Sequence, residues 1–262
     1  MISARIIADS VRDPSPRLTT LQLRMPVFIW PEMLTHRTLS RSARSMRAAP
    51  TRVFLREVLT DPAMPVRFGA AKPGMQDAGP LGGWREPLAR GLYRSARYPA
   101  LGAALTMHLI GVHKQAANRG LTAWAWIDAV VTGTYDRWFE FLALRDHDDA
   151  DPTMREVARV IACQLAFHTP RRLARGEWHL PYVTPGTTGQ TKSLSAARCA
   201  RVSYAPHDAG REDVVRDKAL ADRLLRDRHL SPFEHQAVAV SAWDMARDGN
   251  LTGWRQCRKD VE

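Results

Sequence analysis

The sequence predicts an α+β fold in which an antiparallel or mixed sheet packs against a helical middle section. Three observations support this prediction: strand-like alternation near the start, helical periodicity from about 88 to 175, and a mixture of strand and helix patterns after 193. No internal repeat divides the 262 residues. The simplest organisation is therefore one domain that spans 1–262.

The first predicted elements are two strands. Residues 3–9 and 18–24 alternate between apolar and polar side chains, and the turn sequence Asp13-Pro14-Ser15-Pro16 lies between them. Pro26 then opens a predicted helix that runs to about Arg37, because proline is tolerated in the first turn of a helix. Pro31 lies inside this pattern, so it should kink the helix or delay its true start.

Two loops divide the rest of the chain. Residues 62–87 are rich in proline and glycine and predict a long surface loop, and 182–193 is predicted to be a linker. Between the loops, helical periodicity includes the segments 105–119, 121–145 and 154–168. Beyond the linker we expect, in order, the start of a strand or helix at 195–204, a helix near 211–228, a strand at 235–243 and a short amphipathic tail.

Composition disfavours a membrane protein and a disulfide-stabilised one. Hydrophobic residues make up 45% of the chain, and no apolar stretch reaches the roughly 18–20 residues that a membrane span needs. The first residues include arginine and aspartate where a signal peptide would be apolar, so we expect a cytoplasmic protein, in the host cytoplasm if a phage encodes it. The three cysteines are scattered and form no CxxC pair, so we expect reduced thiols.

The net charge of +11 has three interpretations. The positive charge suits the phosphates of a nucleic acid, or an enzyme whose substrate and cofactors are phosphorylated or carboxylated, or it reflects an arginine-rich surface without a partner. The basic residues form no long runs, and neither a zinc-finger nor an RNA-recognition pattern is present. These observations disfavour nucleic-acid binding.

A cluster of basic and hydroxyl residues follows the first predicted helix. Residues 35–47 (THRTLSRSARSMR) contain four arginines, several hydroxyls and a histidine. Forked guanidinium groups and hydroxyls are good donors to phosphate oxygens, so this segment is a candidate phosphate site. The alternative is a basic, solvated turn.

Two further clusters contain titratable side chains. Arg145 ends an apolar helix and precedes three aspartates around His147; it is either a base-binding residue or a cation favoured at a helix C-terminus. The segment 229–235 (HLSPFEH) contains two histidines and a glutamate that are either acid–base groups or parts of a polar turn. Neither cluster has the ligand spacing of a standard metal site, so we expect no metal.

Together these segments resemble the flavin-dependent thymidylate synthase family, often called ThyX. The family signature, RHR followed by seven residues and a serine, is similar to Thr35-His36-Arg37 with Ser45, and Arg47 lies two residues beyond. Residues 142–145 (LALR) resemble the end of a later family helix, and Arg119 falls where the family has an arginine for the nucleotide phosphate. Residues 200–204 (ARVSY) and 231–235 (SPFEH) resemble two blocks that precede the HR motif in typical members and follow it here. This order resembles a circular permutation, as in phage-type members.

The resemblance implies an enzyme that converts dUMP to dTMP with methylenetetrahydrofolate, FAD and NADPH, acting as a homotetramer with shared active sites. It implies that Ser45, Arg47 and Arg119 bind the nucleotide and that Arg145 is the catalytic residue, which stabilises charge on the pyrimidine. The flavin carries the redox chemistry and the protein positions the reactants. The residues implied to bind FAD are His36, Arg37, Thr38, Ser203, His229, Ser231 and Asp149.

The sequence departs from the family pattern at four positions. Thr35 replaces the first arginine of the signature, Ala43 stands where many members have glutamate, and Asp149 replaces a histidine, although His147 is close. Glu140, counted among the substrate-binding residues, stands where the family usually has asparagine; a carboxylate only accepts hydrogen bonds, which suits the amino group of cytosine.

These departures leave two alternatives open. The first is a related flavin- and folate-dependent methylase or hydroxymethylase that acts on dCMP, or on dUMP, for modified phage DNA. The second lies outside this class: a catalytically inactive, basic nucleic-acid-binding protein.

Overall fold

The structure is a computed structural model that describes residues 1–184, 191–204, 213–240 and 249–262, with only the backbone of 203 and 204. Its main sheet has the strand order β3-β4-β2-β1-β5, and a smaller sheet has the order β6-β7-β8. Pairing is antiparallel throughout both sheets except between β1 and β5. The strands are β1 (Ser3–Arg12), β2 (Ser15–Pro26), β3 (Ser40–Ala43), β4 (Trp126–Thr134), β5 (Arg171–Arg172), β6 (Trp178–His179), β7 (Ala237–Ala239) and β8 (Trp254–Gln256).

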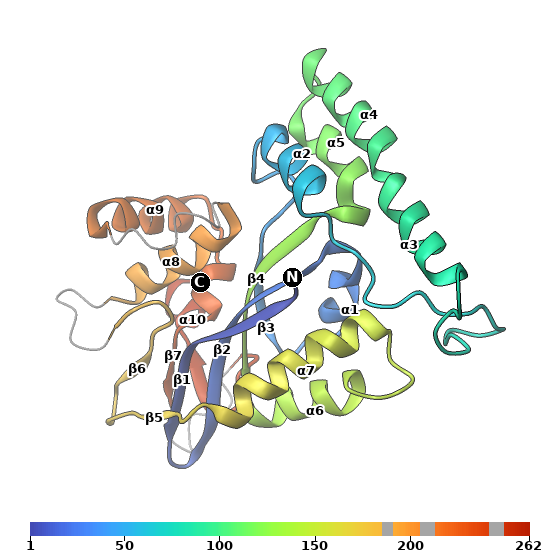
Figure 1. The fold of residues 1–262 in the computed structure, drawn as a ribbon. Coiled ribbons are helices and arrows are strands. Elements are labelled where there is room, and N and C mark those ends of the chain that lie inside the picture. Colours follow the sequence, from blue (N-terminus) through green and yellow to red (C-terminus); the bar gives the residue numbers. More distant parts are fainter. Residues whose placement is uncertain (185–190, 205–212, 241–248) are drawn as a thin grey trace.

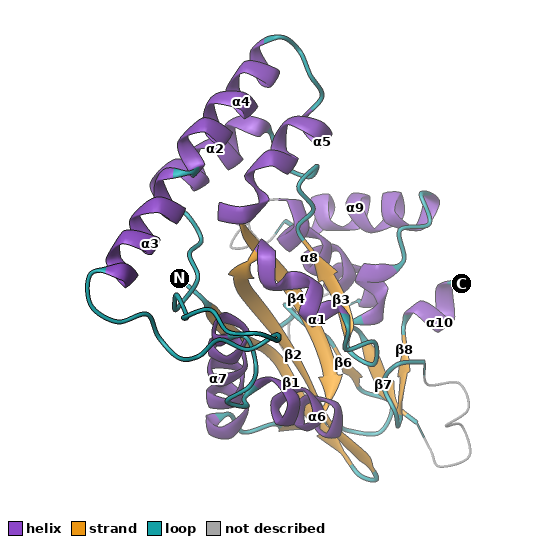
Figure 2. Ribbon diagram, turned by 90° about the vertical axis from the view of Figure 1, so that its right-hand side faces the viewer, coloured by secondary structure: helices purple, strands orange, loops and turns teal. Residues whose placement is uncertain are grey.

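Helices cover the sheets and extend beyond them (Figures 1 and 2). The α-helices are α1 (Trp30–Leu34), α2 (Thr51–Thr60), α3 (Arg85–Ser95), α4 (Arg97–Leu109), α5 (Lys114–Ala117), α6 (Tyr135–Arg145), α7 (Pro152–Phe167), α8 (Lys192–Tyr204), α9 (Val214–Arg226) and α10 (Arg258–Val261). The 3-10 helices are η1 (Val27–Ile29), η2 (Asn118–Trp124) and η3 (Ser231–Glu234). The predicted α+β class is confirmed.

The N-terminal hairpin agrees with the sequence prediction. Strands β1 and β2 pair from Ser3 opposite Arg24 to Arg12 opposite Ser15. The expectation of a helix opening at Pro26 is wrong, because Pro26 is still the last residue of β2, paired with Trp126. The expected delay at Pro31 is confirmed: α1 starts only at Trp30, with the proline in its first turn, where a missing N–H costs little.

Strand β4 is the main correction to the predicted helical middle section. Its segment was expected to be part of a helix over 121–145, yet Trp126–Thr134 is a strand in which every residue is buried. It lies between β3 and β2 and is covered on both faces, so its apolar residues run without the alternation of a half-buried strand. A side chain at Gly133 would meet Leu39 at 2.4 Å, so close packing requires glycine there.

The two faces of the main sheet pack against different helices (Figure 1). On one face, Trp138 and Phe141 of α6 and Val157 of α7 pack on Leu23 and Val131. On the other face, Val130 packs on α8. The same strands therefore contribute to two separate hydrophobic cores. Successive residues of a strand point to opposite faces of the sheet, so they pack in different cores.

Helices α2 to α5 form a group at one end of the sheet, from which α3 and α4 extend as an arm (Figure 2). The loop predicted at 62–87 is confirmed up to Trp84: its described residues form no helix or strand beyond an isolated bridge between Gly69 and Pro80. Asp77 holds the loop by accepting from Arg67 Nη2 at 2.8 Å and from the Gly79 amide at 2.9 Å. None of the residues of α3, all of which are described, is buried.

The C-terminal part contributes α8, α9 and the smaller sheet. The expected helix near 211–228 is confirmed as α9, and the segment at 195–204 belongs to a helix. The predicted strand at 235–243 is confirmed for Ala237–Ala239; its part at 241–243, like residues 185–190 of the predicted linker, lies outside the described residues. The tail packs back on the N-terminal hairpin: Trp254 Nε1 donates to the Pro16 carbonyl at 2.7 Å.

Candidate active site

Strand β3 separates two groups of predicted site residues. Arg41 and Ser42 are neighbours on this strand and therefore face opposite sides of the sheet. The Arg41 guanidinium donates to the carbonyl oxygen of His36, on the α6 side. The Ser42 hydroxyl is hydrogen-bonded to His235, on the α8 side, at 2.9 Å.

On the α6 side, Arg145 is the centre of a small polar group that we call the Arg145 cluster: Glu32, Thr35, His36 and Arg145. Arg145 Nη1 donates to the Glu32 carboxylate at 2.6 Å, and Nε donates to His36 Nε2 at 3.1 Å. Arg145 Nη2 donates to the Thr35 hydroxyl at 3.0 Å and to the Glu32 carbonyl at 3.3 Å. The end of α6 is thereby fixed to the end of α1.

The Arg145 cluster keeps His36 neutral. Burial is the main cause that lowers the His36 pKa, and the positive charges of Arg145 and Arg41 lower it further. A neutral imidazole has one acceptor nitrogen, which is the Nε2 atom that receives the Arg145 N–H. Burial also raises the Glu32 pKa, although Arg145 opposes this shift; the 2.6 Å ion pair indicates an ionised carboxylate at neutral pH.

Arg145 has little remaining capacity as a donor. A guanidinium group has five N–H bonds, and the hydrogen bonds to Glu32, Thr35 and His36 use all but one, on Nη1, within the described residues. The side chain is 15% exposed. A ligand at this cluster therefore meets one N–H and a fixed positive charge.

On the α8 side, two cavities share Ser45 and Arg47. Cavity A has a volume of about 470 Å³ and lies between the end of β3, α5, α8, α9 and the segment at 229–232. Cavity B has a volume of about 440 Å³ and lies between the turn after β3 and the residues around η2. Cavity A is lined by Ser42, Ala43, Ser45, Arg47, Ala48, Lys114, Ala200, Leu224, His229, Ser231 and Pro232. Cavity B is lined by Ser45, Met46, Arg47, Gln115, Arg119 and Thr122.

Both cavities are cationic. Arg47, Lys114 and Arg119 line them, and none of the described lining residues is acidic. Within the described parts of the chain, no carboxylate forms an ion pair with Arg47 or Arg119. Positive charge that the protein leaves uncompensated attracts an anion, and guanidinium and hydroxyl donors together suit phosphate oxygens.

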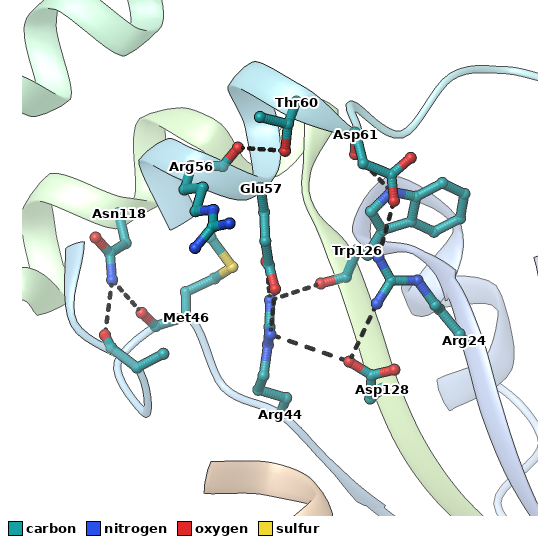
Figure 3. Close-up of polar contacts among 11 residues, drawn as sticks. Arg24, Arg44, Met46, Arg56, Glu57, Thr60, Asp61, Asn118, Trp126 and Asp128 are labelled. Atoms are coloured by element: carbon teal, nitrogen blue, oxygen red, sulfur yellow. Dashed lines mark hydrogen bonds and ion pairs between the residues drawn. The ribbon is translucent and has the colours of Figure 1, made fainter. Parts of the chain in front are cut away.

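Buried Arg44 holds the turn that carries Ser45 and Arg47 (Figure 3). Its guanidinium makes a two-pronged ion pair with Glu57 of α2, with Nη1 at 2.8 Å from Oε1. It also lies over the Phe54 ring, 4.5 Å from the centroid. The backbone N–H of Arg44 donates to the Asp128 carbonyl of β4 at 2.9 Å. Arg44 therefore serves the fold, whereas the sequence grouped it with the phosphate donors.

Asn118 links the two segments that carry the cavity B arginines. Its side chain is fully buried, and its amide nitrogen donates to the carbonyls of Met46 at 2.7 Å and Ala49 at 3.3 Å (Figure 3). The neighbouring residue is Arg119, and Arg47 follows Met46. One side chain thus fixes the spacing between both arginines.

Comparison with known proteins identifies the family of this chain. The family model described as "Thymidylate synthase complementing protein" matches residues 18–171, which is more than half of the chain. The chain belongs to this family. The match contains the Arg145 cluster together with Ser45, Arg47 and Arg119, and it ends before the blocks that contain Ser203, His229 and Ser231.

Solved structures also resemble this member of the thymidylate synthase complementing protein family. One is the crystal structure of a UMP/dUMP methylase, PolB, from Streptomyces cacaoi bound with 5-Br dUMP, with a TM-score of 0.49 and 15% sequence identity. The similarity covers 63% of this chain and 90% of that chain. No curated protein sequence matches the chain.

The structure gathers seven of the twelve residues that the resemblance to this family assigned to substrate and cofactor into two separate groups. Ser45, Arg47 and Arg119 line cavity B, and His229 and Ser231 line cavity A with Ser45 and Arg47. His36 and Arg145 are hydrogen-bonded to each other. These two groups lie on opposite faces of the sheet within one chain.

Other predicted residues of this family member line neither cavity in the described part of the chain, although two lie near the Arg145 cluster: the Arg37 N–H donates to the Thr35 carbonyl at 3.0 Å, and the charge of Glu140 opposes the lowering of the His36 pKa. Arg37 and Thr38 are exposed in the turn after α1. Glu140 is exposed and pairs with Arg137 at 2.7 Å, and Asp149 is exposed beside His147. Ser203 lies in α8, and its side chain lies outside the described part of the chain.

Two negative findings apply to the described residues of this family member. They contain no group of three histidine, cysteine, aspartate or glutamate side chains placed to hold a metal ion. None of the helices they form is long and apolar enough to cross a membrane.

Ser42, Lys114 and Asn118 were missed by sequence reasoning. Ser42 lies inside the basic segment 35–47 and carried no signal beyond its hydroxyl. Lys114 and Asn118 lie inside the predicted helical segment 105–119, close to the assigned Arg119, so their position was the available signal. Whether a side chain points into a cavity or into the interior depends on the packing of α5 and η2, which the periodicity of a short segment does not specify.

Proposed function

We propose that this protein transfers one carbon to carbon 5 of dUMP to form dTMP, with methylenetetrahydrofolate as the carbon donor and NADPH-reduced FAD as the reductant. Membership of the thymidylate synthase complementing protein family supports the reaction class. The observation that carries the proposal is that Ser45, Arg47 and Arg119, from two segments far apart in the sequence, line one cavity.

Cavity B has the properties of a site for a nucleoside monophosphate. A phosphate dianion between Arg47 and Arg119 would receive charge-assisted hydrogen bonds, which are about twice as strong as neutral ones. The Ser45 hydroxyl adds a neutral donor at the same wall, whereas the Thr122 hydroxyl donates to the Arg119 carbonyl at 3.1 Å. Binding would require no rearrangement of a competing carboxylate, because the described lining of the cavity contains none.

The residues of cavity A fit the anionic part of FAD. Its lining combines Arg47 and Lys114 with the hydroxyls of Ser42, Ser45 and Ser231, and His229 lies at its edge. When bound, FAD would supply the hydride chemistry of the reaction. The chain's own contribution is to bind and orient the cofactor next to the nucleotide, since Ser45 and Arg47 line both cavities.

A second copy of the chain completes the site in this proposal. His36, Arg37 and Arg145 lie on the α6 side of the sheet, whereas His229 and Ser231 lie on the α8 side, so one chain does not bring all of them to one ligand. Exposed apolar side chains surround the end of α6, with Phe139 at 64% and Leu144 at 58% exposure. Apolar surface beside a charged cluster is typical of a surface that another chain covers, which supports the expected homotetramer.

Arg145 has an electrostatic role in this proposal. Its guanidinium is held by three neighbours, so its charge is preorganised, and one Nη1–H remains for a pyrimidine carbonyl. Because His36 is neutral, it neither compensates the positive charge of Arg145 nor adds a second charge to it. Negative charge that develops on the carbonyl as carbon 5 attacks would be stabilised without reorganising the site.

The test is an assay of the purified protein with its visible spectrum. We expect flavin absorbance in the protein, tritium release from carbon 5 of labelled dUMP, and dTMP formed only when methylenetetrahydrofolate and NADPH are both present. Faster tritium release from dCMP than from dUMP would replace the proposal with the dCMP alternative. A colourless protein that fails to bind added FAD would contradict both.

Shared active sites can be tested by mixing two variants. Arg145→Ala and Arg47→Ala each remove one half of the proposed site, on opposite faces of the same chain. If the site combines the α6 side of one copy with the α8 side of another, mixing and reassembling the two variants restores part of the turnover at a dUMP concentration that the wild type binds and Arg47→Ala does not. Mixtures that turn over no faster than the separate variants would show that each site lies within one chain.

A further inference from the structure

A continuous chain of buried hydrogen bonds crosses the α8 face of the main sheet. It begins at Ser42 in cavity A, passes through His235, Thr132, Thr20 and His179, and ends at Ser10. Ser42 Oγ is 2.9 Å from His235 Nε2, and His235 Nδ1 is 2.9 Å from Thr132 Oγ1. Thr132 Oγ1 is 2.7 Å from Thr20 Oγ1, which is 2.8 Å from His179 Nε2, and His179 Nδ1 is 2.9 Å from Ser10 Oγ.

Both ends of this hydrogen-bonded chain reach a cavity. Ser42 lines cavity A, and Ser10 lines a third cavity of about 400 Å³ beside β6. The four groups between them, Thr20, Thr132, His179 and His235, have no exposed surface. Water therefore does not reach the middle of the chain, and each group depends on its two neighbours for hydrogen bonds.

Each group in the chain has one hydrogen to share. A hydroxyl donates one hydrogen, and a neutral imidazole donates from one nitrogen and accepts at the other. Burial lowers the pKa of His179 and of His235 to about 3, so both rings are neutral at physiological pH. If one link is reversed, the following links reverse too, because a hydroxyl that accepted from both neighbours would leave its own buried hydrogen without an acceptor among the hydrogen-bond partners in this chain.

We infer that this chain is polarised as one unit, so that a ligand contacting Ser42 in cavity A sets the tautomers of both buried histidines. This makes Ser42 a further ligand-contacting residue of the site, and His235, Thr132, Thr20 and His179 positioning residues behind it. The inference deepens the proposed function, because the ligand chemistry it names is an acceptor oxygen or nitrogen of the FAD expected in cavity A.

The direction follows from the number of hydrogens. When Ser42 donates to a ligand acceptor, its oxygen accepts from His235 Nε2–H, and His235 Nδ1 then accepts from Thr132. Thr132 accepts from Thr20, Thr20 accepts from His179 Nε2–H, and His179 Nδ1 accepts from Ser10. Both histidines then carry the hydrogen on Nε2. A ligand that donates to Ser42 has the opposite effect, and both carry it on Nδ1.

The experiment is ¹H–¹⁵N NMR of the imidazole nitrogens of the full-length protein, which identifies the tautomer of each ring. We expect His179 and His235 to have the same tautomer in the protein without added ligand. Saturation with FAD, with binding followed separately by flavin fluorescence, should leave both rings as Nε2–H. Opposite tautomers, or a response of His235 without one of His179, would overturn the inference.

Variants separate this inference from the proposed function. Ser42→Ala should weaken FAD binding by about three- to tenfold, the typical effect of one hydrogen bond, and should abolish the FAD response of both histidines. Ser45→Ala is the matched control, because it removes another hydroxyl of cavity A that lies outside the chain; the two rings should still respond together. Thr132→Val should uncouple His179 from His235.

Each outcome is decisive for one of the two proposals. FAD that binds without changing the histidines contradicts the coupled chain and leaves the proposed function intact. FAD that does not bind contradicts the proposed function, and the tautomers of the ligand-free protein then decide the inference: equal tautomers support it and opposite ones reject it. Since the wild-type protein provides these readings, an unfolded Thr132→Val variant would not prevent the decision.

Discussion

Arg145 and Arg47 are both predicted to meet the substrate, but the protein treats the two cations differently. Arg145 is held by Glu32, Thr35 and His36, and most of its donors are used within the chain. Arg47 lines two cavities, and no described carboxylate pairs with it. Arg145 therefore provides a rigid, partly compensated positive charge. Arg47 provides a positive charge that no described carboxylate compensates.

This difference suggests separate tasks. A cation that is preorganised by its neighbours contributes where charge develops during a reaction. An uncompensated cation contributes mainly to ground-state binding of an anion. The Arg145 cluster should therefore affect the rate of turnover, and the cationic cavities should affect affinity. The predictions below test this division, from the largest expected effect to the smallest.

The largest effect is expected for Arg145→Ala. Loss of the fixed guanidinium should reduce kcat by about 10²–10³-fold, the range seen when one preorganised donor is removed from an oxyanion site. The dissociation constant for dUMP should change little. Steady-state kinetics and equilibrium binding measure the two quantities separately. Arg145→Lys is the control. Lysine keeps the positive charge but lacks the planar guanidinium group that binds Glu32, Thr35 and His36 together, so kcat should stay low. A raised Kd for dUMP with a normal kcat would show that Arg145 contributes to binding and not to turnover.

Arg47→Ala should show the opposite behaviour. A lost charge-assisted hydrogen bond is worth about 1.5–3 kcal/mol, so the Kd for dUMP should rise about 10- to 100-fold. Isothermal titration of the assembled protein with dUMP gives this value. Arg52→Ala removes an exposed arginine of α2 that lines neither cavity and should bind dUMP like the wild type. Equal losses in both variants would point to a general effect of net charge.

A third test uses pH to compare the buried histidines with the partly buried His36. Unfolded His179 and His235 titrate near 6.5, whereas the folded pKa values are about 3. As pH falls from 6.5 towards 3, the unfolded chain gains protons that the folded chain does not, so stability falls through this window. Each ring contributes up to about 1.4 kcal/mol per pH unit. The His36 pKa is lowered too, so this residue acts in the same direction.

Urea unfolding between pH 7 and pH 4.5 measures this dependence. The midpoint should fall steadily below pH 6.5, and His179→Gln should reduce the slope if the variant folds. The lowered pKa of Asp9 contributes only below its ordinary value of 3.8, outside this range. A midpoint that stays constant over the range would mean that the two histidines are accessible to protons in the folded protein.

Asn118 tests whether the cationic cavity depends on the spacing of its arginines. Asn118→Ala removes the donor to the Met46 and Ala49 carbonyls, and we expect the Kd for dUMP to rise about five- to tenfold, in line with the loss of two neutral hydrogen bonds. Asn118→Asp is the matched variant, because its carboxylate has the same shape but donates no hydrogen bond. It should weaken binding at least as much. Unchanged affinity in both would show that Arg47 and Arg119 are positioned independently.

The smallest effect is expected for Glu140→Gln. The Glu140 side chain is 58% exposed and pairs with Arg137 on its own helix, and such surface pairs contribute little. The ratio of dUMP to dCMP turnover should change less than about threefold, as for the control Glu156→Gln, which alters a carboxylate of α7 that lines neither cavity. A large shift towards dUMP would show that Glu140 reaches the pyrimidine in the assembled protein, and it would revive the dCMP alternative.

Sequence reasoning predicted elements with distinctive local patterns. The β1–β2 hairpin, the loop before α3 and helix α9 could be recognised because alternation, glycine and proline content, and helical periodicity are local properties. Strand β4 could not, because a strand covered on both faces has the same continuous apolar pattern as a buried helix. The available signal was its β-branched residues Ile127, Val130 and Val131, which favour strands. This strand preference is weak and depends on the tertiary packing around the segment.

The candidate site was predictable in composition but not in geometry. The motifs identified Ser45, Arg47 and Arg119, which the structure brings to one cavity. They also grouped Arg44 with these residues, and nothing in the local sequence distinguishes a buried arginine that pairs with Glu57 from one that faces a cavity. His36 and His229 lie on opposite faces of the sheet. This placement depends on which residues of β3 point to each face and on which helices cover that face. Both are tertiary properties.

Cavity A combines segments that lie far apart in the sequence. Its floor comes from β3 and the following turn, and its remaining walls come from α5, α8, α9 and the segment at 229–232. A ribosome makes β3 well before it makes His229 and Ser231. Because protein domains fold as their residues emerge, the strands around β3 can pair before the last lining residues of cavity A are available.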